Sequence, residues 1–372
     1  MKPSDVMGIV FPNTHDRYMG DMTNLRAIGS VPFCGRYRLI DFTLSNLVNA
    51  GISKVGVITK QNYQSLVDHL GSGRSWDLAR KTGGLHLLSP YSTTTARIYE
   101  GKIDALAGTI NYLKTSLEKY VVLCDANLVS NIDIEDVVNK HIETGADFTV
   151  CYKNGVLPRN EQDIMVFKLD KDGFATEVTL PFEQKTCDYS LDVMVVEREL
   201  LIKLVTEAYA LGKRAFASGI IQPRMNELKI YGYKVDGFTA VIDGKDSYYQ
   251  ANMELIKNPD ARKSLFRNGR PVYTKVRDDM PTKYGLESSV SDCLIADGCV
   301  IEGEVQNCVL FRGVKIGKGT KLQNCIVMQD TEIGDNCDIR CAVLDKNITV
   351  NRGITLCGAE SHPIYIAKGE KL

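Results

Sequence analysis

A short polar segment, residues 12–16, directly follows an apolar run at residues 8–11 that predicts a buried strand. In α/β proteins a strand at the start of the chain commonly delivers a phosphate-binding loop, in which glycines let backbone amides approach the phosphates. This segment contains no glycine, and Pro12 has no amide hydrogen to donate. The position is typical of phosphate binding, whereas the residues are not.

Asp125 is the second residue whose position suggests chemistry, because it ends a predicted strand at residues 120–124. Ligands of open α/β sheets bind beyond the carboxyl ends of the strands. A carboxylate there can hold a ligand, or it can simply cap a turn. The sequence alone leaves both interpretations of Asp125 open.

Composition excludes several classes of protein. The 372 residues suggest two domains, and 45 basic against 46 acidic residues argue against a nucleic-acid or membrane surface. We expect a cytoplasmic protein, because no apolar stretch reaches the roughly 18 residues of a membrane span and no signal peptide is visible. The eleven cysteines are interpreted as reduced thiols.

The first two thirds of the chain alternate strand and helix patterns, which predicts a mostly parallel sheet covered on both faces. The predicted strands are residues 8–11, 55–59, 120–124, 148–152, 164–169, 191–196 and 230–235. The predicted helices are residues 43–50, 104–117, 134–143 and 199–210.

The last third repeats every 17 residues. Cutting the chain at Leu310, Val327 and Leu344 aligns LFRGVKIGKGTKLQNCI, VMQDTEIGDNCDIRCAV and LDKNITVNRGITLCGAE, in which apolar residues recur every six positions. A hexapeptide period with Gly or Asn in the turns predicts a parallel β-helix with three short faces per coil. A β-sandwich would instead show alternation within each strand. We therefore predict an α/β domain at residues 1–257, a linker at 258–289 and the β-helix at 290–372.

The segment VPFCGRYRLIDF at residues 31–42, followed by Leu44-Ser45-Asn46, resembles the signature of bacterial glucose-1-phosphate adenylyltransferases, the ADP-glucose pyrophosphorylases. Residues 83–91, 145–147, 247–253 and 295–298 also match the family in order. The resemblance implies a Rossmann-like, GT-A-like nucleotidyltransferase domain followed by a left-handed β-helix. It also implies a reaction in which glucose 1-phosphate attacks ATP, with a magnesium ion and basic groups stabilising the charge.

Several catalytic positions implied by this resemblance are altered. The glycine-rich phosphate loop falls on residues 12–18, where only Arg17 is retained and Pro12, Asn13, Thr14, His15 and Asp16 replace the rest. We expect His15 to be a solvated loop residue rather than a new base. Arg17 either meets a phosphate or pairs with Asp16 or Asp21.

Other family positions are lost as well. Ile28 stands where a lysine stabilises the leaving phosphates, and Lys60 where a glutamine lies near the adenine. Ile98 replaces the tryptophan of a "WYxGTADA" loop that ends here in Gly101-Lys102-Ile103-Asp104-Ala105. Val241 replaces the second metal-binding aspartate, although a loop shift could bring in Asp243. Glu183 replaces the sugar-phosphate lysine unless a gap brings in Lys185.

Asp125 matches the first metal-binding aspartate of the family and is the one metal ligand retained. By itself it would bind a metal weakly. The resemblance also implies an effector site for a phosphorylated metabolite between the two domains, where arginines can grip phosphate oxygens in pairs. The candidate residues are Arg26, Arg36, Arg38, Lys346 and Arg352. Arg38 could instead pair with Asp41 or another carboxylate.

Losses at several points of one reaction predict a catalytically degenerate, regulatory subunit, the type called GlgD. By resemblance it would need no cofactor of its own and would form a mixed oligomer, expected to be a tetramer, with a catalytic GlgC-type subunit that uses Mg²⁺. Two alternatives remain: an active adenylyltransferase with a rebuilt loop, and a stand-alone metabolite-binding or scaffold protein.

Overall fold

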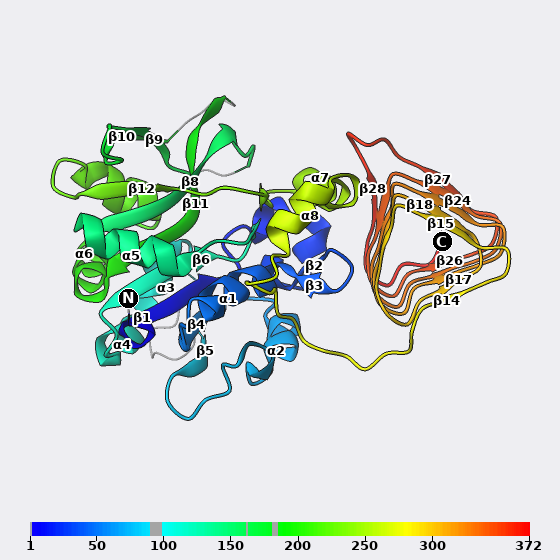
Figure 1. Cartoon of the computed structure of the whole chain (residues 1–372), viewed down its shortest axis with the longest axis horizontal. Coiled ribbons are helices and arrows are strands. Elements are labelled where there is room, and N and C mark those ends of the chain that lie inside the picture. Colours follow the sequence, from blue (N-terminus) through cyan, green and yellow to red (C-terminus); the bar gives the residue numbers. More distant parts are fainter. Residues whose placement is uncertain (1, 90–98, 161–162, 181–184) are drawn as a thin grey trace.

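The computed structural model describes residues 2–89, 99–160, 163–180 and 185–372, which form an α/β domain and a prism-shaped β-helix (Figure 1). The α/β domain is built on a nine-stranded sheet with the main order β10-β9-β11-β6-β1-β4-β5, in which β8 also pairs with β11 and β12 pairs with β8. Its strands are β1 (Val6–Phe11), β4 (Lys54–Ile58), β5 (Gly84–Leu88), β6 (Tyr120–Asp125), β8 (Phe148–Val156), β9 (Val166–Leu169), β10 (Ala175–Thr179), β11 (Thr186–Glu197) and β12 (Ile230–Lys234).

All seven predicted strands are present, and the predicted fold class is confirmed. The sheet is mixed: β1, β4, β5 and β6 pair in parallel, whereas β11 runs antiparallel to β6, β8 and β9. Two small sheets accompany it, β2 (Pro32–Phe33) with β3 (Tyr37–Arg38) and β7 (Leu128–Ser130) with β13 (Thr239–Val241).

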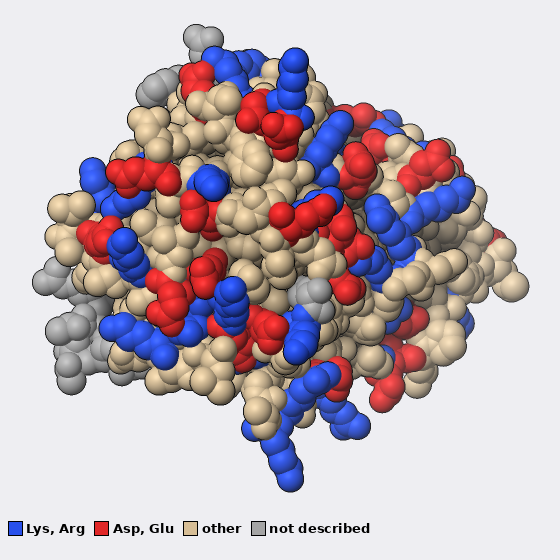
Figure 2. All heavy atoms as spheres, turned by 60° about the vertical axis from the view of Figure 1, so that its left-hand side comes forward, with Lys and Arg blue, Asp and Glu red and all other residues tan. Residues whose placement is uncertain are grey.

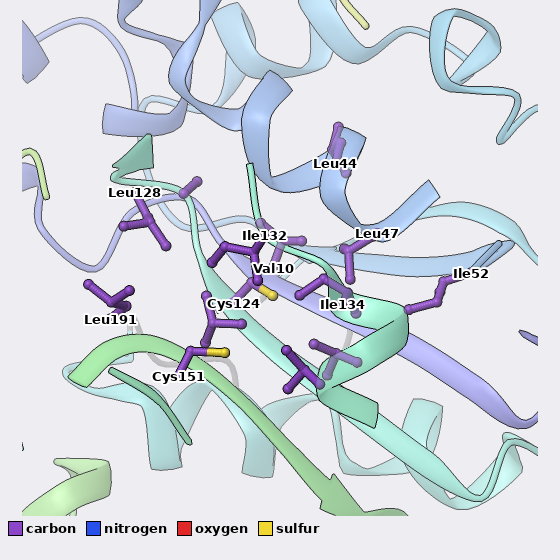
Figure 3. Close-up of a cluster of buried hydrophobic side chains, with 14 of the residues drawn as sticks. Val10, Leu44, Leu47, Ile52, Cys124, Leu128, Ile132, Ile134, Cys151 and Leu191 are labelled. Atoms are coloured by element: carbon purple, nitrogen blue, oxygen red, sulfur yellow. The ribbon is translucent and has the colours of Figure 1, made fainter. Parts of the chain in front are cut away.

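Helices cover both faces of the large sheet, as the alternating pattern predicts. Alternate residues of β1 point to opposite faces, so that Val10 packs in one core and Ile9 in the other. The first core includes α1 (Leu39–Asn49) and α5 (Ile134–Thr144), and Figure 3 shows Leu44 and Leu47 of α1 above Val10 and Cys124. The second core includes α3 (Lys102–Gly108) and α6 (Arg198–Ala210).

The helix predicted over residues 104–117 is two helices, α3 and α4 (Ile110–Thr115). The break falls at Gly108 and Thr109, where glycine weakens the helix and the Thr109 hydroxyl donates back to the carbonyl of Ala105 at 3.0 Å. The remaining helices are α2 (Gln64–Leu70), α7 (Lys245–Lys257) and α8 (Pro259–Leu265). Helix α3 begins at Lys102, directly after Gly101.

The β-helix consists of three five-stranded parallel sheets, and each coil contributes one short strand to each sheet. Apolar residues at the six-residue positions, such as Leu310, Ile316 and Leu322, fill its interior. The predicted hexapeptide β-helix is confirmed. Its strands are β14 (Lys283–Tyr284), β15 (Ser289–Ser291), β16 (Leu294–Ile295), β17 (Val300–Ile301), β18 (Glu304–Gln306), β19 (Val309–Leu310), β20 (Lys315–Ile316), β21 (Lys321–Gln323), β22 (Ile326–Val327), β23 (Glu332–Ile333), β24 (Asp338–Arg340), β25 (Ala342–Leu344), β26 (Thr349–Val350), β27 (Thr355–Cys357) and β28 (Ile364–Ile366).

The connection between the domains differs from the linker expected at residues 258–289. Its first part forms α8, because Asn258 caps the helix by accepting from the amides of Asp260 and Ala261. Its last part already belongs to the β-helix, since β14 pairs with β17. The unpatterned stretch is thus confined to the residues between α8 and β14.

A shared apolar core joins the two domains. Phe33 and Tyr248 of the α/β domain pack in one cluster with Phe311 and Met328 of the β-helix. The hydroxyl of Tyr249 on α7 donates to the carbonyl of Asn324 at 2.8 Å. Helix α7 lies between the sheet and the β-helix in Figure 1, and this packing fixes the residues at the domain boundary.

Candidate functional site

The segment after β1 is folded onto itself. One carboxylate oxygen of Asp16 accepts from the amide of Ile28 at 2.7 Å, and the other accepts from the side-chain amide of Asn13 at 2.8 Å. The side-chain oxygen of Asn13 accepts from the amide of Lys60 at 3.3 Å. The side chains of Asn13 and Asp16 are therefore bound to backbone amides of the neighbouring residues Ile28 and Lys60.

Burial raises the pKa of Asp16 to about 6, although hydrogen bonds from Asn13 and Ile28 and the nearby charge of Lys60 act in the opposite direction. The carboxyl group is therefore held in place by hydrogen bonds in surroundings that disfavour its charge. Pro12 is buried beside this turn, and its carbonyl accepts from the amide of Gly29 at 3.1 Å.

A buried charged cluster lies beyond the carboxyl end of β6. The Lys102 ammonium is 2.9 Å from Oδ2 of Asp125 and 3.0 Å from Oδ2 of Asp192. His15 Nε2 lies 2.6 Å from the same oxygen of Asp125. Together these four side chains link the loop after β1, the end of β6, the start of α3 and the middle of β11.

The local backbone explains how these groups meet. Asp192 has a left-handed conformation (φ 53°) and lies where the register between β11 and β8 shifts, so that a bulge redirects its side chain. Gly101 brings the start of α3 against the backbone of Arg214, where a Cβ atom would lie 2.3 Å from the carbonyl oxygen. This close approach places Lys102 over the two carboxylates.

The pKa values follow this arrangement. Burial on its own would lower the pKa of Lys102, but Asp125 and Asp192 raise it above its ordinary value. Burial acts to raise the pKa of Asp125, yet Lys102 and His15 hold it below its usual range. The pKa of Asp192 is raised, chiefly by burial. Lys102 thus remains an ammonium ion between its partners.

The interpretation of His15 as a solvated loop residue is wrong, because its side chain is buried and bonded to Asp125. Sequence reasoning also missed Lys102 and Asp192 as members of the site. A lysine in the first turn of a helix opposes the helix dipole, and an aspartate interrupts an otherwise apolar run in β11. Both irregularities are visible in the sequence and could have indicated a buried ion pair.

These residues do not fit a magnesium ion. Mg²⁺ requires octahedral ligands, chiefly oxygen atoms at about 2.0–2.1 Å, whereas Oδ2 of Asp125 is already contacted by an ammonium and an imidazole nitrogen. Among the described residues, the ligand atoms that lie within 4.8 Å of one another belong to His15, Asp125 and Asp192, and Asp243 is not part of this group. Val241 lies on β13, paired with Leu128.

The other altered positions surround an open cleft of about 710 Å³ lined by residues that include Arg17, Lys60, Lys102 and Asp192. Arg17 lies over the ring of Tyr18, with 4.6 Å between the guanidinium carbon and the ring centre. Ile28 is fully buried at a turn beside the cleft. Ile98 and Glu183 fall outside the described residues.

A group of basic residues lies at the domain boundary. The pKa of Lys346 is lowered to about 6, chiefly by burial and also by the charges of Arg38, Arg26 and Lys368, against the influence of Asp345. Burial likewise lowers the pKa of Arg38 to about 10, with Arg26 and Arg277 acting in the same direction. The boundary therefore concentrates positive charge.

Some of these cations already have partners. Arg26 is buried and its guanidinium binds the carboxylate of Asp345, which also accepts from the Tyr365 hydroxyl at 2.6 Å. The guanidinium of Arg38 donates to the carbonyl of Ser65 at 2.6 Å. The Asp41 carboxylate accepts from the backbone amide of Arg38, at 2.9 Å. Arg26 thus ties the N-terminal loop region to the β-helix.

Arg36 and Arg312 extend this group of basic residues. Burial lowers the pKa of Arg312, and Arg36 and Arg277 add to the effect. Arg312 is only 6% exposed, and within the described part of the chain its Nε has no hydrogen-bond partner. Arg352 lies apart from these residues and is exposed. It lies near Lys315 and Glu332, beside the β-helix sheet that contains β20 and β23.

The outer surface gives little indication of function. Figure 2 shows basic and acidic side chains interspersed over the face it presents, in keeping with the nearly balanced charge. Among the described residues, no helix is both long enough and apolar enough to cross a membrane.

The fold and cleft define a nucleotidyltransferase domain joined to a hexapeptide β-helix. Residues 19–162 match the family model described as nucleotidyl transferase, and residues 279–362 match that of the GlmU-like C-terminal hexapeptide. The glycogen biosynthesis protein GlgD of Bacillus subtilis is 35% identical over 98% of this chain and 96% of its own length.

Two further relatives indicate the same family. The GlgD protein of Geobacillus stearothermophilus is 37% identical over 84% of this chain and 82% of its own. The glucose-1-phosphate adenylyltransferase of Thermosipho melanesiensis is 31% identical over 85% and 77%. The chain belongs to the bacterial glucose-1-phosphate adenylyltransferase family, and within it to the GlgD type.

Proposed function

We propose that this chain is a catalytically degenerate, regulatory subunit of ADP-glucose pyrophosphorylase, which modulates a catalytic GlgC-type subunit. The kinship with GlgD proteins and adenylyltransferases supports a role in glycogen synthesis. In this role the chain requires no cofactor of its own, and Mg²⁺ serves the catalytic partner, with which it assembles as a hetero-oligomer, expected to be a tetramer.

The single observation that carries the proposal is the closed loop after β1. A triphosphate bound there would have to displace the Asp16 carboxylate from the Ile28 amide and Asn13 from the Lys60 amide. When ionised, Asp16 would also repel the phosphates. Losing even one group that stabilises the transition-state charge commonly lowers a rate by on the order of 100-fold, and here several positions are altered together.

The regulatory part of the proposal rests on the domain boundary. A phosphorylated metabolite would be held there by Arg36, Arg38 and Lys346, with Arg277 and Arg312 as further donors. Burial is the main cause of the lowered pKa of Lys346 and Arg38, and repulsion from neighbouring basic groups adds to it. An incoming phosphate would offset both effects by favouring the charged forms. The charge of Arg26 is already balanced by Asp345, so Arg26 would take part through changes in this ion pair. Arg352 is left out of this set because it lies on another sheet.

The boundary and the loop are physically connected, which suits a regulatory device. Arg26 follows the loop in sequence and donates to the carbonyl of Met22 at 2.9 Å as well as to Asp345. An anion that changes the Arg26 to Asp345 pair would therefore act on the segment that leads back to Asp16.

The test is an assay of ADP-glucose synthesis by this chain alone, by the GlgC-type subunit alone and by their mixture, with candidate sugar phosphates varied. We expect no product from this chain alone and a changed rate or effector dependence in the mixture. ATP-dependent turnover by the purified chain would instead establish an active enzyme with a rebuilt loop. Self-association alone, without any effect on the partner, would favour a stand-alone metabolite-binding protein.

A further inference from the structure

The Lys102 ammonium lies between the two carboxylates of the cleft, 2.9 Å from Asp125 and 3.0 Å from Asp192. We infer that Lys102 is a built-in cation which takes the place of a divalent metal ion, so that this cleft is maintained without metal. The inference concerns the cation of the site and holds whether or not the chain regulates a partner.

Charge is the first argument. Asp125 and Asp192 bring two carboxylates together where their side chains are only 1% and 12% exposed. Like charges this close destabilise each other unless a cation lies between them. Lys102, whose own side chain is 12% exposed, supplies that cation from within the chain.

Geometry is the second argument. One ligand atom from each of His15, Asp125 and Asp192 lies within 4.8 Å of the other two, which is the spacing of a potential metal site. The ammonium of Lys102 contacts both carboxylates of this set, and a metal ion bound to the same oxygens would meet a positive charge at contact distance. Metal and lysine therefore exclude each other.

The remaining oxygen of Asp125 does not alter this conclusion. Within the described residues Oδ1 of Asp125 is buried and has no hydrogen-bond partner. A single open oxygen can accept one hydrogen bond, for example from a water molecule or a hydroxyl group. To a metal ion it would offer a single protein ligand beside the Lys102 ammonium, whose positive charge opposes binding.

The inference predicts that removing the ammonium uncovers a metal site. In the Lys102→Thr variant, His15, Asp125 and Asp192 would offer one nitrogen and two carboxylate ligands within reach of one ion. This donor set suits a transition ion such as Mn²⁺, which accepts imidazole as well as carboxylate. The substitution also restores the threonine of the family loop pattern.

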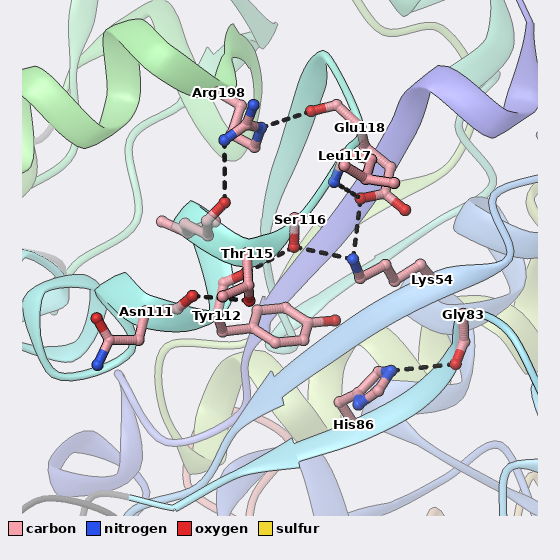
Figure 4. A network of polar contacts seen from close by, with 11 residues as sticks. Lys54, Gly83, His86, Asn111, Tyr112, Thr115, Ser116, Leu117, Glu118 and Arg198 are labelled. Carbon is pink, nitrogen blue, oxygen red and sulfur yellow. Dashed lines mark hydrogen bonds and ion pairs between the residues drawn. The ribbon is translucent and has the colours of Figure 1, made fainter.

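The experiment is a titration of the purified full-length chain with Mn²⁺, in which electron paramagnetic resonance reports the free ion. We expect Lys102→Thr to bind one Mn²⁺ at least tenfold more tightly than the natural chain, and the gain to disappear in the double variant Lys102→Thr with Asp125→Asn. Lys54→Thr is the matched control. Lys54 is also a mostly buried, ion-paired lysine, 2.9 Å from Glu118 (Figure 4). It begins β4 and is not among the residues that line the cleft.

Several outcomes would overturn the inference: tight Mn²⁺ binding by the natural chain, no gain in a folded Lys102→Thr variant, or an equal gain in Lys54→Thr. If Lys102→Thr does not fold, crystals of the natural chain soaked in Mn²⁺ decide the matter by anomalous scattering. If these crystals show no ion at Asp125 and Asp192, the inference is supported. If they show an ion there, it is overturned. Metal binding by a chain that makes no ADP-glucose would refute this inference and leave the proposed function intact.

Discussion

Two buried cationic regions of this molecule differ in how their charge is balanced. In the cleft, Lys102 is bracketed by Asp125 and Asp192, which raise its pKa. At the domain boundary, burial lowers the pKa of Lys346 to about 6, and the charges of Arg38, Arg26 and Lys368 outweigh that of Asp345. Lys102 thus lies between two carboxylates, whereas Lys346 lies mainly among basic groups.

The difference indicates where a ligand is needed. A buried charge that has its partners gains little from an added ion, whereas a cluster of like charges gains from any anion that enters it. In the cleft the buried charges are therefore balanced within the chain, whereas the domain boundary is the region where we propose that an anion binds. The predictions below test this contrast.

The largest effect is expected from Asp125→Asn, which leaves the buried Lys102 with one counter-charge instead of two. Removing one partner of a buried ion pair commonly costs about 3–5 kcal/mol, and we expect a loss of this order in the free energy of unfolding measured with denaturant. The control is Asp21→Asn at an exposed pair with Lys245, 3.4 Å apart, for which the loss should stay below about 1 kcal/mol. Equal losses would remove the distinction between the cleft and an ordinary surface pair.

At the domain boundary, a bound sugar phosphate should stabilise the chain. At a concentration about 100 times its dissociation constant, it should add about 2.7 kcal/mol to the free energy of unfolding. Lys346→Met should weaken binding and reduce this stabilisation. Arg352→Met is the control, because Arg352 lies beside another sheet. Loss of binding in Arg352→Met with no change in Lys346→Met would place the anion elsewhere.

Anion binding should also take up protons. Lys346 is largely neutral in the folded chain above its pKa of about 6, and a bound phosphate would raise that pKa. Calorimetry near pH 7.5 in two buffers of different ionisation enthalpy should detect uptake of up to about one proton. The uptake should be absent in Lys346→Met. Identical binding enthalpies in both buffers for the natural chain would contradict the prediction.

The same lysine should affect stability with a defined sign. Its pKa is lower in the folded chain than in the unfolded chain, so the unfolded state binds more protons between about pH 6 and 10.5. The stabilising contribution of the neutral lysine is fully present above about pH 10.5. It decreases as the pH falls and is lost once the pH has passed through about 6. The free energy of unfolding of Lys346→Met, compared with the natural chain, should lack this dependence.

The smallest effect is expected at Asp16. Its pKa of about 6 is above the ordinary value of 3.8, so the folded chain binds more protons than the unfolded chain between these values. The contribution of Asp16 to stability is present below about pH 3.8 and is lost as the pH rises through about 6. The natural chain should therefore gain stability relative to Asp16→Asn as the pH falls from 6 to 4. A constant difference would show that Asp16 is not buried in solution.

Much of the fold could be predicted because its signals are local. The 17-residue repeat specifies the β-helix, since each coil buries one residue per face against its neighbours. The seven strands predicted from the alternation of strand and helix patterns are present, and Asp125 lies at the end of β6 as predicted. The expected linker was too long at both ends, because the cap at Asn258 and the short pairing of β14 are weak signals in a polar stretch.

The site was harder to predict because its partners come from distant parts of the sequence. His15 was interpreted as solvated because its neighbours in the chain are polar, yet it is buried against Asp125. Asp192 reaches the cleft because β11 runs antiparallel beside β6 and contains a bulge. Neither the direction of that strand nor the shift in its register can be deduced from one sequence.

The sequence by itself determined the class of this protein and the loss of the phosphate loop, because both depend on which residues occupy consecutive positions. Glycine is absent from residues 12–16, and no folding can restore the amide of Pro12. Only the tertiary structure decided which groups surround Asp125. Whether a buried carboxylate meets a metal, a lysine or another carboxylate depends on distances of a few ångströms between segments far apart in the chain, and these distances place Lys102 between Asp125 and Asp192.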